Sequence, residues 1–584
     1  MKQEPRKIGW LLFLFYVIAY LLFLGERPIL RFDEARYAEI PREMIQSGDW
    51  VVPRLNGVRY FEKPTLGYWL TALSIQIFGE NDFALRLVPA LSAGVSALAV
   101  FWMASLQGIG GRLLGFASAA VLLSSPLFFA LGTLNLLDMP LTMFLTVGLA
   151  FFFAAYKTER SSTRDRCLAL LGVAAGCAFL MKGFLGVVLP SLAILPFLAW
   201  ERKLLAWLPR LWIPLLTACL LILPWSLLIH AREPDFWRYF LFEEHWKRLL
   251  PEKTVHPNPF WYYIPVLLGG FFPWSFFLPA WVRGLRGSLR EEPLLKFAFC
   301  AFALPFLFFS LLSGKLSTYI LPCFPPLAIL TGAGLLRSFE LGDRRSFHAS
   351  VCGVLFLTLL GALGLCLVQV AGFSFAPYRS GEGWKWAFAC LSLISFGGTA
   401  WWAHTVRKPV PRILLLAVTP LLAMVCYQVA MPQAVEKEIS PEEFLIRHKE
   451  RVVSGKEIYA EKYLFHTVCW VYKRSDVILF DDAGELDYGL GYEDAKHRII
   501  SFAKFNSMVR EGRESRLVTL VTRKRIYLEV KDQLPHPVYE AMDGGFVLSQ
   551  YGPAQKELQI SSQQVHFEPW STKLILISSR PFPW

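Results

Sequence analysis

Long apolar runs separated by short polar loops fill the first three quarters of the chain. Each run approaches the roughly 20 residues that a helix needs to cross a membrane. Hydrocarbon cannot satisfy exposed backbone groups, so such runs are expected to be helical. The pattern predicts thirteen spans, at residues 8–24, 84–106, 113–131, 139–156, 167–181, 184–200, 208–229, 260–280, 295–312, 318–336, 350–373, 384–403 and 411–431.

The pattern changes after the last predicted span. Apolar runs shrink to strand length, and helix-like stretches lie between them, which is typical of an α/β domain. We therefore predict an α-helical polytopic membrane protein, with a membrane domain at 1–431 and a soluble C-terminal α/β domain at 432–584. The segments that carry this prediction are Asp476–Phe480 and Arg516–Thr522 as strands, and Pro441–Arg451 and Ser501–Glu511 as helices.

Basic residues test the order of the spans. With the N-terminus in the cytoplasm, every cytoplasmic loop carries Lys or Arg, from Arg112 in the first to Arg407, Lys408 and Arg412 in the last. This is the distribution that the positive-inside rule requires. The outer side then receives the long first loop, residues 25–83, the shorter outer loops and the whole tail.

Composition agrees with a membrane protein. The 584 residues are 54% hydrophobic and 18% charged, and the mean hydropathy is +0.41. The formal charge of +13 fits topology signals and contacts with anionic lipid or phosphate better than nucleic acid. Of the ten cysteines only Cys469 lies in the polar tail, so no disulfide framework is predicted.

The apolar run at 8–24 follows Lys2, Arg6 and Lys7, as in a signal peptide. No small-x-small cleavage site follows it and more spans come after, so we interpret it as the first span.

The first outer loop is unusually charged. In Arg31–Met44, apolar residues at helical spacing predict a helix on the membrane surface, kinked at Pro41 and ending at Ser47-Gly48. A solvated helix with paired charges is the alternative. Position favours a functional role for Asp33 and Glu34, because both stand near the exit of the first span, where a carboxylate meets lipid headgroups.

Two further outer segments carry charge at a membrane edge. In Tyr60–Pro64, Lys63 can hold a phosphate as a point charge, whereas a pair with Glu62 would be a weak surface contact. Asp138 opens a span, where it either caps the helix or marks a functional site.

The remaining outer loops add a histidine, cations and a hydroxyl. His245 titrates near neutrality and, together with Glu62, can hold a divalent cation, although a lone histidine is more often structural. Lys315 and Tyr319 enter a span, either as a phosphate clamp or as a snorkelling lysine and an interfacial tyrosine. Polar groups gathered at the outer ends of spans favour chemistry on an amphiphilic substrate over transport.

Three of these segments resemble a known family. Asp33–Glu39, Tyr60–Pro64 and Lys315–Pro322 are similar to signature segments of the bacterial aminoarabinose transferases of lipid A. These are glycosyltransferases of the GT-C type, related to the protein O-mannosyltransferases. The resemblance covers the membrane region and the plan of thirteen spans plus a periplasmic domain, and the tail matches least well.

The resemblance implies a reaction and a set of site residues. The donor would be 4-amino-4-deoxy-L-arabinose on undecaprenyl phosphate, and the acceptor a lipid A phosphate, giving resistance to polymyxin and other cationic peptides. The enzyme would lie in the inner membrane with its site facing the periplasm. It would need no nucleotide cofactor, because the lipid carrier activates the sugar. The resemblance and the charged outer segments together give the predicted site residues, of which Lys315 and the metal pair rest on the segments alone. They are Asp33 and Asp138 in catalysis, Arg36, Tyr37, Lys63, Lys182, Arg248, Lys315 and Tyr319 in substrate binding, and Glu62 and His245 at a metal.

Two alternatives stay open on the sequence. One is a related polyprenyl-phosphate-sugar transferase with another sugar or a protein hydroxyl as acceptor. The other is a lipid flippase or transporter, which would form no covalent product and would tolerate Asp33→Asn. The expected partners are the undecaprenyl-phosphate-linked sugar donor, the lipid A acceptor and the surrounding membrane lipids. Neither nucleic acid nor a required protein partner is expected.

Overall fold

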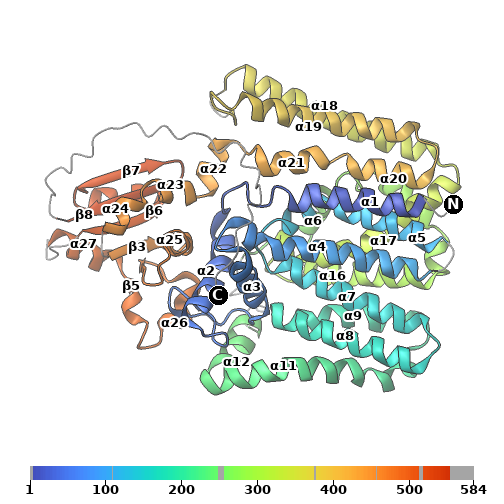
Figure 1. Ribbon diagram of the computed structural model, residues 1–584, viewed down its shortest axis with the longest axis horizontal. Coiled ribbons are helices and arrows are strands. Elements are labelled where there is room, and N and C mark those ends of the chain that lie inside the picture. The colour runs from blue at the N-terminus through green and yellow to red at the C-terminus, as the bar shows by residue number, and fades with distance from the viewer. Residues whose placement is uncertain are drawn as a thin grey trace, which may run out of the picture.

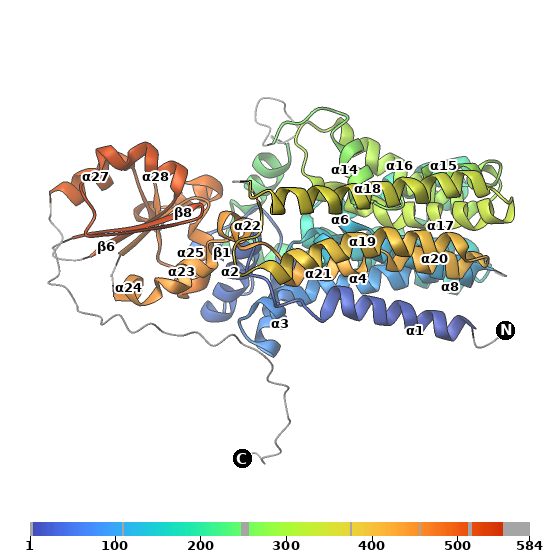
Figure 2. The same cartoon turned by 90° about the horizontal axis from the view of Figure 1, so that it is seen from above.

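The computed structural model describes residues 4–107, 110–246, 256–373, 376–454, 457–511 and 517–552. Bundled helices form one end of the molecule and a sheet with flanking helices forms the other (Figures 1 and 2). The first outer loop, with helices α2 and α3, lies between the two parts.

Eight helical segments of the described residues are long and apolar enough to cross a membrane. Their predicted spans are thus confirmed as helical. They are α4 (Asp82–Ser105), α7 (Asp138–Lys157), Leu204–Arg232 (α10, η2 and α11), α16 (Pro293–Leu311), Ser317–Glu340 (η6 and α17), α18 (Arg344–Val370), α19 (Gly383–Thr405) and Pro409–Val429 (α20 and α21).

A ninth span is possible at the predicted segment 113–131. There α5 (Gly111–Leu123) and α6 (Pro126–Gly132) are bent by 70°. Pro126 begins α6, and a proline cannot donate the backbone hydrogen bond that would continue α5.

The other four predicted spans also fall on helices, but these are shorter, interrupted or more polar. The count of thirteen therefore stays a prediction. These helices are α1 (Glu4–Tyr16) running into the π-helix η1 (Val17–Leu21), α8 (Ser161–Lys182), α9 (Leu185–Trp200), and α14 (Tyr263–Gly270) followed by α15 (Leu278–Leu285).

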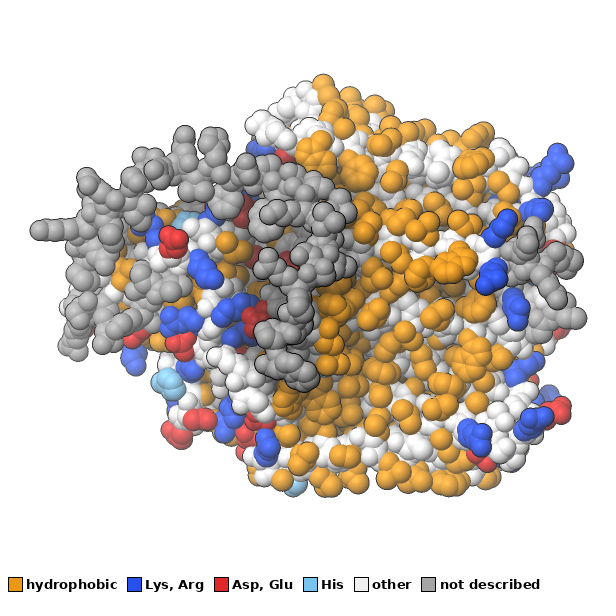
Figure 3. All heavy atoms as spheres, in the orientation of Figure 1, with side chains coloured by type: hydrophobic (Ala, Val, Ile, Leu, Met, Phe, Trp, Pro, Cys, Tyr) orange, Lys and Arg blue, Asp and Glu red, His pale blue; other side chains and the backbone are white. Residues whose placement is uncertain are grey.

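The surface of the bundle agrees with a membrane location. Hydrophobic side chains cover the visible face of the helices, and Lys and Arg gather at the rim farthest from the sheet (Figure 3). That rim holds the loops predicted to be cytoplasmic, as the positive-inside rule expects.

The first outer loop folds into α2 (Arg31–Ser47), the hairpin β1 (Arg54–Leu55) and β2 (Val58–Arg59), and α3 (Leu66–Phe78). Helix α2 runs through Pro41 and ends at Gly48, whose φ of +70° suits glycine at a helix end. The predicted end is confirmed. Helix α2 lies neither on the membrane surface nor in solvent, which were the two expectations for it. It packs against α3 and the tail helix α25 (Phe465–Tyr472), and even Glu39 on its polar side is buried.

The tail contains a six-stranded sheet in the order β5-β4-β3-β6-β8-β7. The first four neighbours are parallel, whereas β8 and β7 add on antiparallel. The strands are β3 (Glu457–Glu461), β4 (Ile478–Phe480), β5 (Ile499–Ile500), β6 (Val518–Arg523), β7 (Tyr539–Asp543) and β8 (Phe546–Tyr551).

Both predicted tail strands are present, and so is the helix predicted at 501–511, as α27 (Phe502–Arg510). The helix predicted at 441–451 is instead divided at His448 into α23 (Glu442–Arg447) and α24 (Lys449–Ser454). Ser501 caps α27 through a hydrogen bond from the Lys504 backbone N–H, which is the usual role of serine at a helix start. The tail helices include α22 (Gln433–Ile439), α23 (Glu442–Arg447), α24 (Lys449–Ser454), α26 (Asp487–Leu490), α27 (Phe502–Arg510) and α28 (Lys524–Val530).

Candidate active site

Helix α2 presents the first charged group of the site. Asp33 and Arg36, one turn apart, form an ion pair. The Asp33 side chain is 62% exposed, whereas that of Arg36 is 9% exposed. The Arg36 guanidinium lies 5.1 Å from the ring centre of Tyr37 and donates to the Tyr60 hydroxyl at 3.2 Å. Asp33 is therefore an accessible carboxylate held by a buried cation.

The loop after β2 adds Glu62 and Lys63. The Tyr60 hydroxyl donates to Glu62 Oε2 at 3.0 Å, which connects this loop to Arg36. Lys63 Nζ forms an ion pair with Glu244 and lies 3.8 Å from the Glu62 carboxylate. Glu244 belongs to the π-helix η3 (Tyr239–Trp246), which follows α12 (Phe236–Arg238).

The tail contributes Glu485, which the sequence analysis missed. Glu485 lies in the short turn η7 (Gly484–Leu486) after β4 and pairs with Arg36. The Tyr60 hydroxyl lies 3.4 Å from its carboxylate. No sequence signal marks this residue, because its partner stands more than 400 positions earlier in the chain.

The environment of Glu485 makes its carboxyl group less acidic than usual. Burial raises the pKa of Glu485, and the charges of Glu62 and Asp33 act in the same direction, against the effect of Arg36. Like charges in proximity disfavour ionisation in this way.

A second cluster joins the ends of three membrane helices. Lys182, at the end of α8, donates to Asp138 Oδ1 at 2.7 Å, and its Nζ lies 5.1 Å from the ring centre of Tyr319 in η6 (Ser317–Cys323). Helix α7 starts at Asp138, and its N-cap is Leu137. The capping role considered for Asp138 is therefore wrong, although a carboxylate in the first turn still suits the helix dipole.

Tyr37 connects the two clusters. Burial raises the pKa of Tyr37, and the carboxylates of both Asp33 and Asp138 add to this effect. Tyr37 also stacks on Tyr68 at 6.1 Å between ring centres. The structure thus brings together most of the predicted site residues, namely Asp33, Arg36, Tyr37, Glu62, Lys63, Asp138, Lys182 and Tyr319; their roles stay predictions.

Of the other three predicted residues, Lys315, Arg248 and His245, only Lys315 has a described side chain. Lys315 is buried, and its ammonium donates to the backbone carbonyls of Asn258 and Leu312, an arrangement that braces its own loop. Arg248 lies outside the described residues. His245 lies in η3, but its side chain is not among those described.

Of the two residues predicted to hold a metal, Glu62 and His245, only Glu62 has a described side chain. The Glu62 carboxylate accepts a hydrogen bond from the Tyr60 hydroxyl and lies beside the Lys63 ammonium. This ammonium would compete with a metal ion for the carboxylate. Among the described residues no group of three or more His, Cys, Asp or Glu side chains is placed to hold a metal ion. The metal site stays a prediction.

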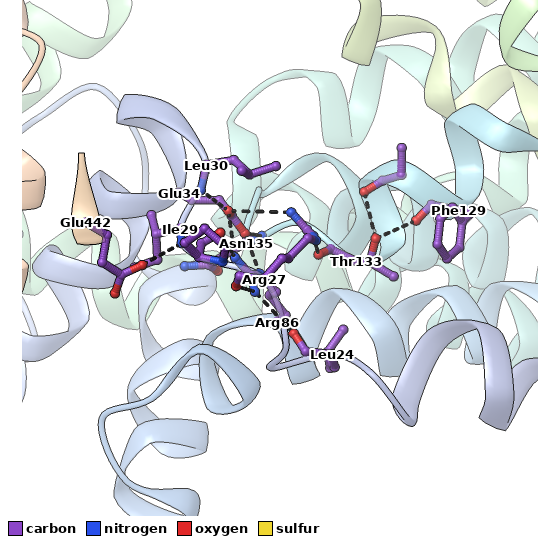
Figure 4. A network of polar contacts seen from close by, with 12 residues as sticks. Leu24, Arg27, Ile29, Leu30, Glu34, Arg86, Phe129, Thr133, Asn135 and Glu442 are labelled. Atoms are coloured by element: carbon purple, nitrogen blue, oxygen red, sulfur yellow. Dashed lines mark hydrogen bonds and ion pairs between the residues drawn. The ribbon is translucent and has the colours of Figure 1, made fainter. Parts of the chain in front are cut away.

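Glu34, the neighbour of Asp33, belongs to a separate buried network (Figure 4). Arg86 donates to both Glu34 oxygens, at 2.9 and 3.0 Å, and Arg27 lies 4.0 Å away. The backbone N–H groups of Leu30 and Asn135 also donate to this carboxylate. Burial opposes ionisation, yet the two guanidiniums outweigh it and lower the pKa of Glu34.

Contacts between the tail and the outer loops fix the geometry of the site. Arg59 Nε donates to Glu233 at 2.9 Å, and its Nη1 donates to Asp494 Oδ2 of the tail at 2.7 Å. Tyr488 of α26 packs on Tyr239 of η3 at 4.4 Å between ring centres. The tail therefore contacts both the loop that carries Lys63 and the helix that carries Glu244.

Comparison with known proteins places this geometry in a family. The dolichyl-phosphate-mannose-protein mannosyltransferase model matches residues 9–240. The model of the C-terminal domain of the arabinosyl transferase ArnT matches residues 436–550. The crystal structure of ArnT from Cupriavidus metallidurans bound to undecaprenyl phosphate has a TM-score of 0.78 at 24% identity, covering 93% of this chain and 98% of that one. It shares the fold.

Curated relatives are similar over nearly their whole length. An undecaprenyl phosphate-alpha-4-amino-4-deoxy-L-arabinose arabinosyl transferase of Aeromonas hydrophila is 36% identical over 518 residues, 88% of this chain and 93% of the relative. A protein of the same name from Shewanella sediminis is 34% identical over 559 residues, 94% and 99% of the two chains. This chain belongs to the family of undecaprenyl phosphate-aminoarabinose arabinosyl transferases, which are membrane glycosyltransferases.

Proposed function

We propose that this protein transfers 4-amino-4-deoxy-L-arabinose from undecaprenyl phosphate to a phosphate group of lipid A. Relatives named for this donor match the chain at 33–36% identity over most of their length. The single structural observation that supports it most strongly is the accessible carboxylate of Asp33 on the Arg36 guanidinium. Hydrogen bonds through Tyr60 connect this pair to Glu62, which lies beside Lys63. We place the site and the tail on the periplasmic face of the inner membrane.

The reaction exchanges one phosphate for another at the sugar C1. The bond from C1 to the donor phosphate oxygen breaks, and the bond from C1 to a lipid A phosphate oxygen forms. Negative charge grows on the leaving undecaprenyl phosphate, and an ammonium placed there stabilises it. Lys63 is the described residue best suited to this, provided that the phosphate joins or displaces Glu244.

Asp33 has a different role in the proposed reaction. A phosphate acceptor is largely ionised at neutral pH, so little proton removal is needed. The Asp33 carboxylate then stabilises the positive charge that develops on the sugar ring and positions Arg36. Direct displacement inverts the anomeric centre, and the anomeric configuration of the product by NMR tests that step.

The proposed reaction changes the charge of the outer envelope. Each transfer adds an ammonium group to a lipid A phosphate and so lowers its net negative charge. Cationic peptides such as polymyxin bind anionic surfaces electrostatically, and we expect them to bind the modified surface less well.

Mass spectrometry of lipid A tests the proposal. The chain is expressed in a transferase-null, polymyxin-sensitive strain, with Asp33→Asn alongside and both proteins confirmed in the membrane. We expect a mass increase of one aminoarabinose with the wild type only. No increase with the wild type contradicts the proposal and favours another sugar or a protein hydroxyl acceptor. If a covalent product is absent altogether, a flippase remains.

The Glu62–His245 metal site is tested separately by metal analysis of the purified protein. A stoichiometric divalent ion that is lost in Glu62→Gln supports it. An equal metal content in both proteins contradicts it.

A further inference from the structure

The tail reaches the site through one carboxylate. Glu485 extends from the turn after β4 to the Arg36 guanidinium on α2, and its side chain is still 37% exposed. Asp33 binds the same guanidinium and is 62% exposed. Two accessible carboxylates from distant parts of the chain therefore share one buried cation.

This arrangement leaves negative charge uncompensated. In the part of the chain that the structure describes, Arg36 is the one cation that pairs with either carboxylate. The nearby His466 of α25 adds no positive charge, because burial and then the charge of Arg36 lower its pKa well below the ordinary value. A site with a surplus carboxylate is suited to a cationic ligand.

Aromatic groups surround the same cation. The Tyr60 hydroxyl lies within 3.4 Å of the Glu485 carboxylate, and the stacked rings of Tyr37 and Tyr68 lie beside Arg36. Tyrosine faces attract cations, and a hydroxyl can accept a hydrogen bond from an ammonium. Carboxylate and aromatic groups together are the elements with which proteins recognise an ammonium group.

We propose that Glu485 binds the ammonium group of the transferred sugar and so makes the enzyme selective for an aminosugar. The inference rests on the proposed function, in which the donor sugar carries an amine. Asp33 is the carboxylate assigned to the sugar ring, and Glu244 is engaged with Lys63. Glu485 is the remaining carboxylate on Arg36, and it can turn from the guanidinium to the substrate while Asp33 keeps Arg36 in place.

Selectivity between two donors tests this role. The purified full chain is assayed with lipid A and either the aminoarabinosyl polyprenyl phosphate or its arabinosyl analogue, in which a hydroxyl replaces the amine. A hydrogen bond between charged groups corresponds to about a 10- to 100-fold effect on kcat/KM. We expect Glu485→Gln to lower kcat/KM by that factor for the amino donor and by less than about threefold for the analogue.

Two further variants make the test decisive. Glu485→Asp keeps the charge and is expected to retain most of the selectivity. Asp494→Asn removes another tail carboxylate that contacts the outer loop, through Arg59, and is expected to leave the selectivity unchanged. Equal losses with both donors in Glu485→Gln would mean that Glu485 only holds Arg36, and this would overturn the inference. No transfer from the amino donor by the wild type would instead overturn the proposed function.

Discussion

Asp33 and Glu34 are neighbours in sequence and lie in opposite kinds of polar cluster. Glu34 is buried and accepts hydrogen bonds from Arg86 and two backbone N–H groups. A second guanidinium, that of Arg27, lies 4.0 Å from the same carboxylate. Asp33 is exposed and shares its one guanidinium with Glu485. The first arrangement holds the outer loop on the membrane helices. The second leaves a carboxylate that a substrate can engage.

This difference follows from the geometry of a helix. Side chains one position apart point in directions about 100° apart on an α-helix, so α2 turns Glu34 toward Arg86 of α4 and Asp33 toward the site. The many charged residues of this loop therefore indicate in the sequence that the loop is important. They do not show which residues stabilise the fold and which take part in the reaction. The variants below separate them.

Glu34→Gln should have the largest effect, and on stability. Removing one partner of a buried ion pair costs about 3–5 kcal/mol, because it leaves the other charge uncompensated. We expect a loss of folded protein in the membrane and a lower thermal unfolding temperature, with normal turnover per folded molecule. Turnover lost at unchanged stability would place Glu34 in the chemistry.

Asp33→Asn should have the opposite profile. Loss of a group that stabilises charge in the transition state typically lowers kcat about 100- to 1000-fold. The Asp33 carboxylate is exposed, and Arg36 keeps Glu485 as a partner when Asp33 is neutralised. The lost pair should therefore cost at most about 1 kcal/mol of stability, and the unfolding temperature should barely change. A rate within threefold of the wild type would remove Asp33 from the catalytic set.

Acid should inactivate the enzyme before it unfolds. Glu34 has a pKa below the ordinary 4.5, so its stabilising contribution is complete above that pH and is lost only as the pH falls through the lowered pKa. Glu485 has a raised pKa and takes up a proton above 4.5, with the protein still folded. We expect transfer of the amino donor to fall about tenfold between neutral pH and 4.5 while the circular dichroism of the helices persists.

The Glu485→Gln variant checks this prediction. Its rate of amino-donor transfer is already low at neutral pH and should not fall further between neutral pH and 4.5. Activity and helical signal that disappear at the same pH in the wild type would contradict it.

Glu244→Gln should have the smallest effect, and a favourable one. The neutral amide competes less for Lys63, so a polyprenyl phosphate should bind about three- to tenfold more tightly, the range of one hydrogen bond. Lys63→Met provides the matched control, in which binding should be weakened. Weaker binding in Glu244→Gln would show that Glu244 supports the phosphate site instead of competing for it.

The sequence predicted the helices and strands of this protein better than the contacts between their side chains. Apolar runs located the helices because hydrophobic length is a local property. Charged segments at their outer ends drew attention to Asp33, Lys63 and Asp138, and the family resemblance added Lys182. The ion pairs could not be predicted, because Lys63 and Glu244 are 181 positions apart. Glu485 was missed for the same reason, and Lys315 turned inward to carbonyl groups that no sequence pattern reveals.

The most direct test is the rate of aminoarabinose transfer to lipid A per folded molecule, measured with purified wild type, Asp33→Asn and Glu34→Gln. The account predicts transfer by the wild type, a loss of about 100- to 1000-fold in Asp33→Asn, and near-normal transfer by whatever Glu34→Gln protein remains folded. Transfer that survives in Asp33→Asn, or that is lost equally in both variants, would contradict the assignment of chemistry to one carboxylate and support to its neighbour.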